Sequence, residues 1–174
     1  METRTEQDFL GKMKLPADAP WGIHTARALE NFPIPGSSVP ISLISALFQV
    51  KKACALANKD LGYLSIEKAD AIISACDRVP SASCPLPALQ GGAGTSTNMF
   101  VNELIAHKAG EVIHPIEDVN LHQSTNDVYP TAVKVAAIYG LRQLAEKIEV
   151  LQGVFQRLES QFAHIPTIGK TEQV

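Results

Sequence analysis

The most restrictive feature of this sequence is an apolar seam in its last third. Apolar side chains recur there at alternating steps of four and three residues, at Ala137, Leu141, Leu144, Ile148, Leu151, Phe155, Leu158 and Phe162. A mean spacing of about 3.5 residues is typical of a helix that packs against nearly parallel helices. The sequence therefore predicts a long helix, from about Asp127 to about Ala163, that belongs to a helical bundle.

The length of this helix sets a requirement on the rest of the molecule. At about 1.5 Å per residue it extends roughly 55 Å, whereas a compact domain made by the preceding residues is only about 30–35 Å across. The seam therefore needs partner helices that this chain does not supply. We expect them in sequence that follows residue 174, in other subunits, or in both.

The fold class predicted is mainly α, with an N-terminal helical domain over residues 1–126 and the first long bundle helix, truncated, over residues 127–174. Proline and glycine interrupt residues 1–38, which we interpret as an irregular arm with room for one short β-hairpin. Apolar periodicity and capping residues predict three further helices. These helices span residues 41–60, 66–79 and 96–109, with Ser65 as the N-cap of the second and Gly110 at the end of the third.

The apolar positions of the first two of these helices define a candidate core. In the helix over residues 41–60 they are Ile44, Leu47, Phe48, Ala55 and Leu56. In the helix over residues 66–79 they are Ile66, Ala69, Ile73, Cys76 and Val79.

Composition excludes several classes of protein. Hydrophobic residues make up 45% and charged residues 19%, which is typical of a globular chain. A net charge of −3 without a basic stripe gives no reason to expect nucleic-acid binding. No run approaches the roughly 20 apolar residues of a membrane span, and the polar N-terminus has no signal core. The three cysteines lack paired spacing, so we expect a cytoplasmic protein without a disulfide framework.

Two polar turns carry the strongest functional signal. Each precedes a predicted helix; their sequences are Gly91-Gly92-Ala93-Gly94-Thr95-Ser96-Thr97-Asn98 and Gln123-Ser124-Thr125-Asn126-Asp127. A helix start presents unpaired N–H groups and the positive end of the peptide dipoles, so it favours an anion. Ser, Thr, Asn and Asp are also ordinary N-caps, and for either turn alone this alternative is the better one. The pair favours a ligand with negative charge, such as a carboxylate.

Both turns resemble the signature regions of the aspartase/fumarase superfamily. Gln90–Met99, followed by Val101-Asn102-Glu103, resembles the first region, and Gln123–Asp127, with Tyr129-Pro130-Thr131, resembles the second. Gly22-Ile23-His24-Thr25 is similar to part of the N-terminal arm of that superfamily. The form Gln-Gly-Gly-Ala-Gly-Thr-Ser is more similar to aspartate ammonia-lyase than to class II fumarase, whereas Trp21 is more typical of the fumarases.

This resemblance implies an architecture and a reaction. The architecture is a mainly helical subunit with a central bundle, assembled as a homotetramer in which each active site draws on three subunits. The reaction is the reversible elimination of ammonia from L-aspartate to give fumarate. We expect no cofactor, and no cluster of side chains in this sequence has the spacing of metal ligands. The partners implied are a small dicarboxylate or amino-diacid substrate and further copies of the chain. The resemblance also implies that this chain is about the first third of a typical subunit.

The resemblance further implies a set of substrate-binding residues. Thr95, Ser124 and Thr125 would hold the β-carboxylate, Asn126 together with Thr95 would contact the leaving amino group, and Thr171 would contact the α-carboxylate. The catalytic base of the family is a serine on a mobile loop whose motif is absent here. We therefore expect the base beyond residue 174 and expect this chain alone to be inactive.

Two positions depart from the family pattern. Glu172 stands where His or Gln is usual; we include it among the substrate-binding residues, because a carboxylate there would alter specificity or impair function. Ile116 stands where fumarases have the Asn of a turn that forms a secondary anion site, which argues against such a site here. None of the five histidines shows the spacing of a metal ligand or of a base with a positioned partner.

Two alternatives to an aspartate ammonia-lyase remain open at this point. The first is a class II fumarase-like hydro-lyase. The second is a short non-catalytic module that associates through its apolar seam.

Overall fold

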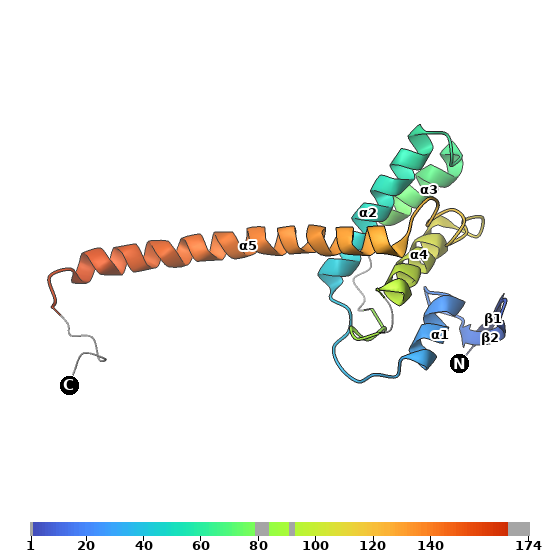
Figure 1. Ribbon diagram of the computed structural model, residues 1–174, viewed down its shortest axis with the longest axis horizontal. Coiled ribbons are helices and arrows are strands. Elements are labelled where there is room, and N and C mark those ends of the chain that lie inside the picture. Colours follow the sequence, from blue (N-terminus) through green and yellow to red (C-terminus); the bar gives the residue numbers. More distant parts are fainter. Residues whose placement is uncertain (1, 79–83, 91–92, 167–174) are drawn as a thin grey trace. The chain divides into compact units, whose positions relative to one another are not determined.

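A computed structural model describes residues 2–78, 84–90 and 93–166 of the chain (Figure 1). Its elements are β1 (Thr3–Asp8), β2 (Gly11–Pro16), α1 (Ile23–Asn31), α2 (Ile41–Asp60), α3 (Ile66–Cys76), α4 (Thr95–Ala109) and α5 (Thr125–Phe162). The predicted mainly helical fold with an N-terminal hairpin is therefore confirmed. The chain divides into two compact units, residues 1–136 and residues 137–174, and the division falls inside α5. The domain boundary at residue 126 stays a prediction.

β1 and β2 form the antiparallel hairpin for which the arm has room. Asp8 faces Gly11 across the turn, and its Oδ1 accepts hydrogen bonds from the N–H groups of Leu10 and Gly11 at 2.9 and 3.1 Å. The Arg27 guanidinium donates to both Asp8 oxygens at 2.7 Å. This hydrogen-bonded pairing lowers the pKa of the Asp8 carboxyl and raises that of Arg27. The hairpin is thus joined to α1 through its turn.

The expectation of an irregular arm is wrong over Ile23–Asn31, which form α1. The cause is a capping group from a distant part of the chain. The buried Glu103 carboxylate accepts from the N–H groups of Gly22, His24 and Thr25 at 2.9, 2.8 and 3.1 Å, and from the Thr25 hydroxyl at 2.6 Å. A carboxylate at a helix start accepts hydrogen bonds from the exposed N–H groups and interacts favourably with the positive end of the helix dipole. No local capping side chain precedes this helix, because its N-cap is Gly22.

α2 forms as predicted, from Ile41 to Asp60. Ile44, Leu47 and Phe48 are buried, together with Ala55. Leu56 is the exception, because 42% of it is exposed.

α3 begins after Ser65, whose hydroxyl oxygen accepts from the N–H of Lys68 at 3.3 Å, as the capping prediction requires. Its buried face agrees with the predicted one at two of the described positions and differs at two. Ala69 and Cys76 are buried, but Ile66 is 63% exposed and the intervening buried residue is Ile72, not Ile73. Val79 lies outside the described residues.

α4 is the central helix of the first unit. It ends at Ala109 and is followed by its C-cap Gly110, whose φ of 115° suits glycine. Every residue from Phe100 to Ala106 is buried, the pattern of a helix enclosed on all sides. Helices α1, α2 and α3 all contact it. Burial among these helices raises the pKa of the Cys76 thiol to about 12.

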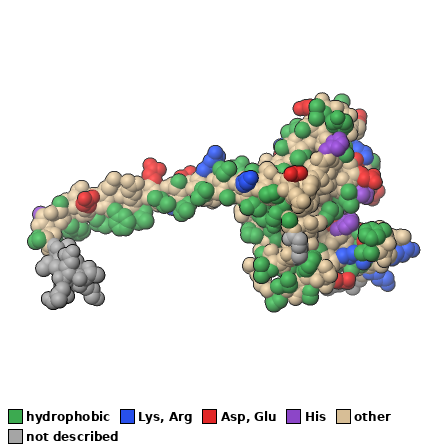
Figure 2. All heavy atoms as spheres, in the orientation of Figure 1, with side chains coloured by type: hydrophobic (Ala, Val, Ile, Leu, Met, Phe, Trp, Pro, Cys, Tyr) green, Lys and Arg blue, Asp and Glu red, His purple; other side chains and the backbone are tan. Residues whose placement is uncertain are grey.

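α5 confirms the predicted long helix and begins two residues earlier than expected. Pro130 therefore lies in the second turn, where it has no N–H to donate to the Asn126 carbonyl. In the second unit, taken by itself, the apolar side chains follow one side of the helix (Figure 2). The exposed seam residues are Leu141, Leu144, Ile148, Leu151, Phe155, Leu158 and Phe162. Among the described residues, no helix has the length and apolarity to cross a membrane.

Candidate active site

The turn before α4 and the start of α5 meet within the first unit. Gly94 is the N-cap of α4 and has a left-handed φ of 86°. A Cβ at this position would lie 2.4 Å from the ring of Tyr129 in α5, so glycine is required both by the backbone and by the close approach. Gly94 and Tyr129 line a cleft of about 330 Å³ together with Asn126. The structure thus brings the two predicted turns together.

Two of the predicted substrate-binding residues, Asn126 and Thr95, line hollows at the first turn of α4, and Ser124 and Thr125 line neither of these hollows. Asn126 lines the cleft with Gly94 and Tyr129. Thr95 is exposed and lines a neighbouring hollow of about 580 Å³ with His24 and Arg27 of α1. Because Gly94 and Thr95 are consecutive, the two hollows flank the first turn of α4. Thr171 and Glu172 lie outside the described residues.

Ser124 and Thr125 retain donor capacity in this arrangement. The Ser124 oxygen accepts from the Asn126 N–H at 3.2 Å, and the Thr125 oxygen accepts from the Asn98 amide at 3.1 Å. A hydroxyl that accepts a hydrogen bond still carries its own O–H donor. The start of α5 therefore presents two hydroxyl donors, which is what a carboxylate ligand needs.

The first turn of α4 is held in shape by Gln90. Its Oε1 accepts from the Thr97 N–H at 3.1 Å, and its Nε2 donates to the Thr97 hydroxyl at 2.9 Å and to the Pro87 carbonyl at 3.0 Å. One of the exposed N–H groups of the helix start is thereby paired. The positive end of the α4 dipole lies beside the cleft and favours an anion there.

A buried lysine lies behind these turns, and sequence reasoning missed it. Lys51 of α2 is fully buried, and its amine donates to Asn120 Oδ1 at 2.8 Å and to Gln123 Oε1 at 2.9 Å. A signal for it existed, because Lys51 is three and four residues after Phe48 and Leu47, on the apolar face of that helix. Burial lowers the pKa of Lys51 to about 7.

Asn120 connects this lysine to both turns. Its Oδ1 accepts not only from Lys51 but also from the amides of Asn98 and Asn102 of α4, each at 3.1 Å. The same Asn98 amide donates to Thr125. The Oδ1 atoms of Asn98 and Asn102 are buried and have no hydrogen-bond partner among the described residues. Both amides thus direct their donors towards Asn120.

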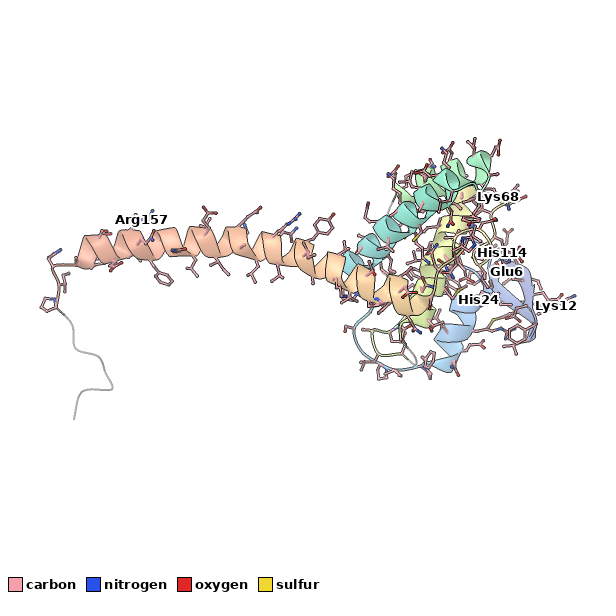
Figure 3. The ribbon with its side chains drawn as sticks, turned by 45° about the horizontal axis from the view of Figure 1, so that its top comes forward. Glu6, Lys12, His24, Lys68, His114 and Arg157 are labelled. Atoms are coloured by element: carbon pink, nitrogen blue, oxygen red, sulfur yellow. The ribbon has the colours of Figure 1, made fainter. Side chains whose placement is uncertain are left out.

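A third hollow, of about 900 Å³, lies between the hairpin, α1 and the chain after α4. Glu6, His24 and His114 line it, and Figure 3 shows them on the same part of the first unit. The ring nitrogen Nδ1 of His114 accepts from the N–H groups of Ile116 and Glu117 at 3.2 and 3.1 Å, so this turn uses its own donors internally. Among the described residues, no three His, Cys, Asp or Glu side chains are placed to hold a metal ion.

Comparison with known proteins places the chain among lyases. The sequence profile of the family described as lyase matches residues 11–173. The fumarate hydratase class II of Ralstonia nicotianae is 41% identical over 98% of this chain and 40% of its own length. The aspartate ammonia-lyase of Corynebacterium glutamicum is also 41% identical, over 97% of this chain and 35% of its own length.

Solved structures are similar as well. The fumarate lyase:delta crystallin of Brucella melitensis superimposes with a TM-score of 0.91 and 41% identity, over 98% of this chain and 44% of its own. The class II fumarase of Schistosoma mansoni gives a TM-score of 0.73 and 35% identity, over 78% of this chain and 32% of its own. The chain spans about two fifths of the length of the curated fumarate hydratase that it matches. From its matched residues and its fold, the chain belongs to the lyase family of the aspartase/fumarase superfamily.

Proposed function

We propose that this chain provides the carboxylate-binding part of a lyase active site that releases fumarate from L-aspartate. The observation that supports this proposal is the meeting of the two polar turns, where Gly94 and Asn126 line one cleft. The hydroxyls of Ser124 and Thr125 lie at the start of α5. The proposed substrate is a succinyl-type diacid, whose carboxylate would lie at these two helix starts.

The chemistry explains the choice of side chains. A base removes a proton from Cβ, and the electron pair delocalises into the adjacent carboxylate as a dianionic enediolate. The carbon–nitrogen bond then breaks, ammonia leaves with the bonding pair, and the double bond of fumarate forms. Hydroxyl and amide donors stabilise the developing charge without adding a competing one. Thr95, Ser124 and Thr125 are the proposed donors to the β-carboxylate, and Asn126 is the proposed contact of the amino group.

A hydro-lyase acting on L-malate is the second candidate. It is supported by relatives named fumarate hydratase whose identity to this chain equals that of the named ammonia-lyase. The two reactions share the diacid, the enediolate and the product, and differ in the leaving group. The proposed contact of the leaving group is Asn126, so the two reactions would be distinguished there. Thr171 is proposed to contact the α-carboxylate, which both substrates share, and Glu172 is the neighbouring carboxylate that would alter specificity.

Two further properties belong to the same proposal. The exposed seam of α5 is proposed to pack against other copies of the chain, with a tetramer as the expected assembly in the cytoplasm. The catalytic serine motif of the family is absent from the 174 residues. The chain assayed by itself is therefore expected to be inactive.

The experiment is a spectrophotometric assay of fumarate that uses the protein expressed from its complete gene. L-aspartate and L-malate are supplied in turn; fumarate from aspartate supports the first candidate, fumarate from malate supports the second, and fumarate from neither contradicts both. Ser124→Ala and Thr125→Val should each slow turnover by about a hundredfold, the scale of a lost oxyanion donor. Ser160→Ala is the control, because within the described part of the chain its exposed hydroxyl bonds only to the helix carbonyl of Gln156. Unchanged kcat in the first two variants would remove these hydroxyls from the mechanism.

A further inference from the structure

The segment that leads into the Ser124 turn is held by two side chains of one helix. Lys51 and Asn58 are seven residues apart on α2, so they lie on the same face. The Lys51 amine bonds to the side chains of Asn120 and Gln123, and the Asn58 amide donates to the Leu121 carbonyl at 3.1 Å. Side chains of α2 therefore form hydrogen bonds to the first, second and last residues of the connection 120–123.

This connection is compact and has an unusual backbone. Asn120 Nδ2 donates to the Gln123 carbonyl at 3.0 Å, and Gln123 Nε2 donates to the Val119 carbonyl at 2.9 Å. His122, between them, has a φ of 58°, a left-handed value that few side chains other than glycine adopt. Such a conformation persists only where its surroundings fix it. The side-chain bonds from α2 are those surroundings.

We propose that Lys51 is a positioning residue of the carboxylate site, fixing the Ser124-Thr125-Asn126 turn through Asn120 and Gln123. This inference rests on the proposed function for the ligand, while the fixing of the turn is independent of it. Lys51 does not touch the cleft itself; it acts through the two amides. Asn120 also orients Asn98, which donates to the Thr125 oxygen, so one amine is linked to both helix starts.

An apolar side chain would be the simpler way to fill this position. Taking a lysine out of water disfavours its charged form, and its hydrogen-bond acceptors here are amide oxygens instead of a carboxylate. Asn98 and Asn102 also leave buried carbonyl oxygens unpaired while they donate to Asn120. Groups with such unfavourable placement are concentrated at functional sites. A positioning role accounts for both features, because the donors converge on the residue that shapes the turn.

The charge of the amine gives the role a pH signature. Burial lowers the pKa of Lys51 to about 7, so the amine gains its positive charge as the pH falls through neutrality. The titratable groups that interact with it are the thiols of Cys54 and Cys76, and burial raises the pKa of both, which keeps them neutral. Asp118, two residues before the connection, is paired with Lys68 of α3 at 2.8 Å. His122, within the connection, has its Nδ1 2.9 Å from Asn58 Oδ1. A positive charge behind the turn should strengthen binding of a dicarboxylate.

The test uses the protein as its gene encodes it, with Lys51→Met, Lys51→Arg and the control Lys52→Met. Lys52 is the neighbouring residue and pairs with Asp77 away from the site. Hydrogen exchange is measured at the backbone N–H groups of Gln123 and Asn126 in the absence of ligand. Exchange there should be about tenfold faster in Lys51→Met, the scale of one lost buried hydrogen bond, and unchanged in Lys52→Met.

Succinate binding is then measured by calorimetry from about pH 6 to about pH 8.5, on either side of the Lys51 transition near 7. In the unchanged protein the affinity should fall as the pH rises through this range. Lys51→Met should bind about tenfold more weakly at the lower pH, with no such transition. Lys51→Arg, which keeps its charge and is the variant to use if Lys51→Met does not fold, should bind without the transition.

The outcomes separate the two claims. Absence of succinate binding in the unchanged protein contradicts the proposed function, while the exchange rates still decide whether Lys51 fixes the turn. Succinate binding with the same exchange rates and the same pH dependence in all variants overturns the role of Lys51 and leaves the proposed function in place.

Discussion

Replacing Gly94 by alanine tests whether the starts of α4 and α5 form one rigid wall. Two costs are expected. The left-handed φ of 86° costs an L-residue about 1–2 kcal/mol. The new Cβ would lie 2.4 Å from the Tyr129 ring, and forcing an extra methyl group into such a contact costs about 1–3 kcal/mol. Gly94→Ala should therefore lower the free energy of unfolding by about 2–5 kcal/mol.

Gly62→Ala separates the two costs. Gly62 has a similar φ of 73°, but a Cβ there meets nothing within 4 Å, so only the backbone cost of about 1–2 kcal/mol applies. Adding Tyr129→Ala to Gly94→Ala removes the ring, and the double variant should recover about 1–3 kcal/mol relative to the sum of the single variants. Urea unfolding followed by circular dichroism measures the unchanged protein, the three single variants and the double variant.

The reasoning would be refuted if Gly94→Ala cost no more than Gly62→Ala. It would also be refuted if removal of the Tyr129 ring showed no coupling to Gly94→Ala. Either result would mean that the turn before α4 and the start of α5 can move apart.

The other predictions concern α1, the buried lysine and the seam. Glu103→Ala leaves buried donors unpaired and should destabilise the fold by about 2–4 kcal/mol in urea; a cost near zero would contradict its capping role. Because the pKa of Lys51 is lowered to about 7 in the folded state, the unfolded chain binds more protons above that pH, and stability should rise by about 2 kcal/mol from about pH 7 to about pH 8.5. Lys51→Met should lose this rise, and equal pH profiles would contradict it. The chain alone should self-associate in light scattering, and Leu144→Lys with Leu151→Lys should reduce this; a monodisperse monomer at high concentration would contradict the seam.

Periodicity and capping predicted the larger helices because their signals are local. Ser65 caps α3 from the adjacent residue, and the seam of α5 repeats over many turns. α1 was missed because its cap, Glu103, lies far along the chain. The buried face of α3 was predicted with Ile73 in place of Ile72 because the two isoleucines are equally apolar in the sequence, and only packing decides which of them is buried.

The candidate site likewise contains residues that the sequence predicted and residues that it did not. Its two turns were predicted from their residues, since hydroxyls and amides before a helix have a local meaning, and the structure brings them together at Gly94 and Asn126. The support behind them was not predicted. Lys51, Asn98 and Asn120 come from three different segments, so their convergence follows from the packing of α2 and α4 and has no local pattern.

The enclosure of α4 has a consequence for how the protein tolerates exchange of residues. A helix buried from Phe100 to Ala106 has no free surface along which it can slide or rotate. Thr95 is at the start of this helix and Glu103, which holds α1, is two turns later. A substitution at the exposed hairpin tip, where Phe9 is 93% accessible, leaves the position of α4 unchanged. A substitution between Phe100 and Ala106 affects both α1, through Glu103, and the turn at Thr95. Inherited substitutions should therefore be rare in this enclosed stretch and common at the hairpin tip.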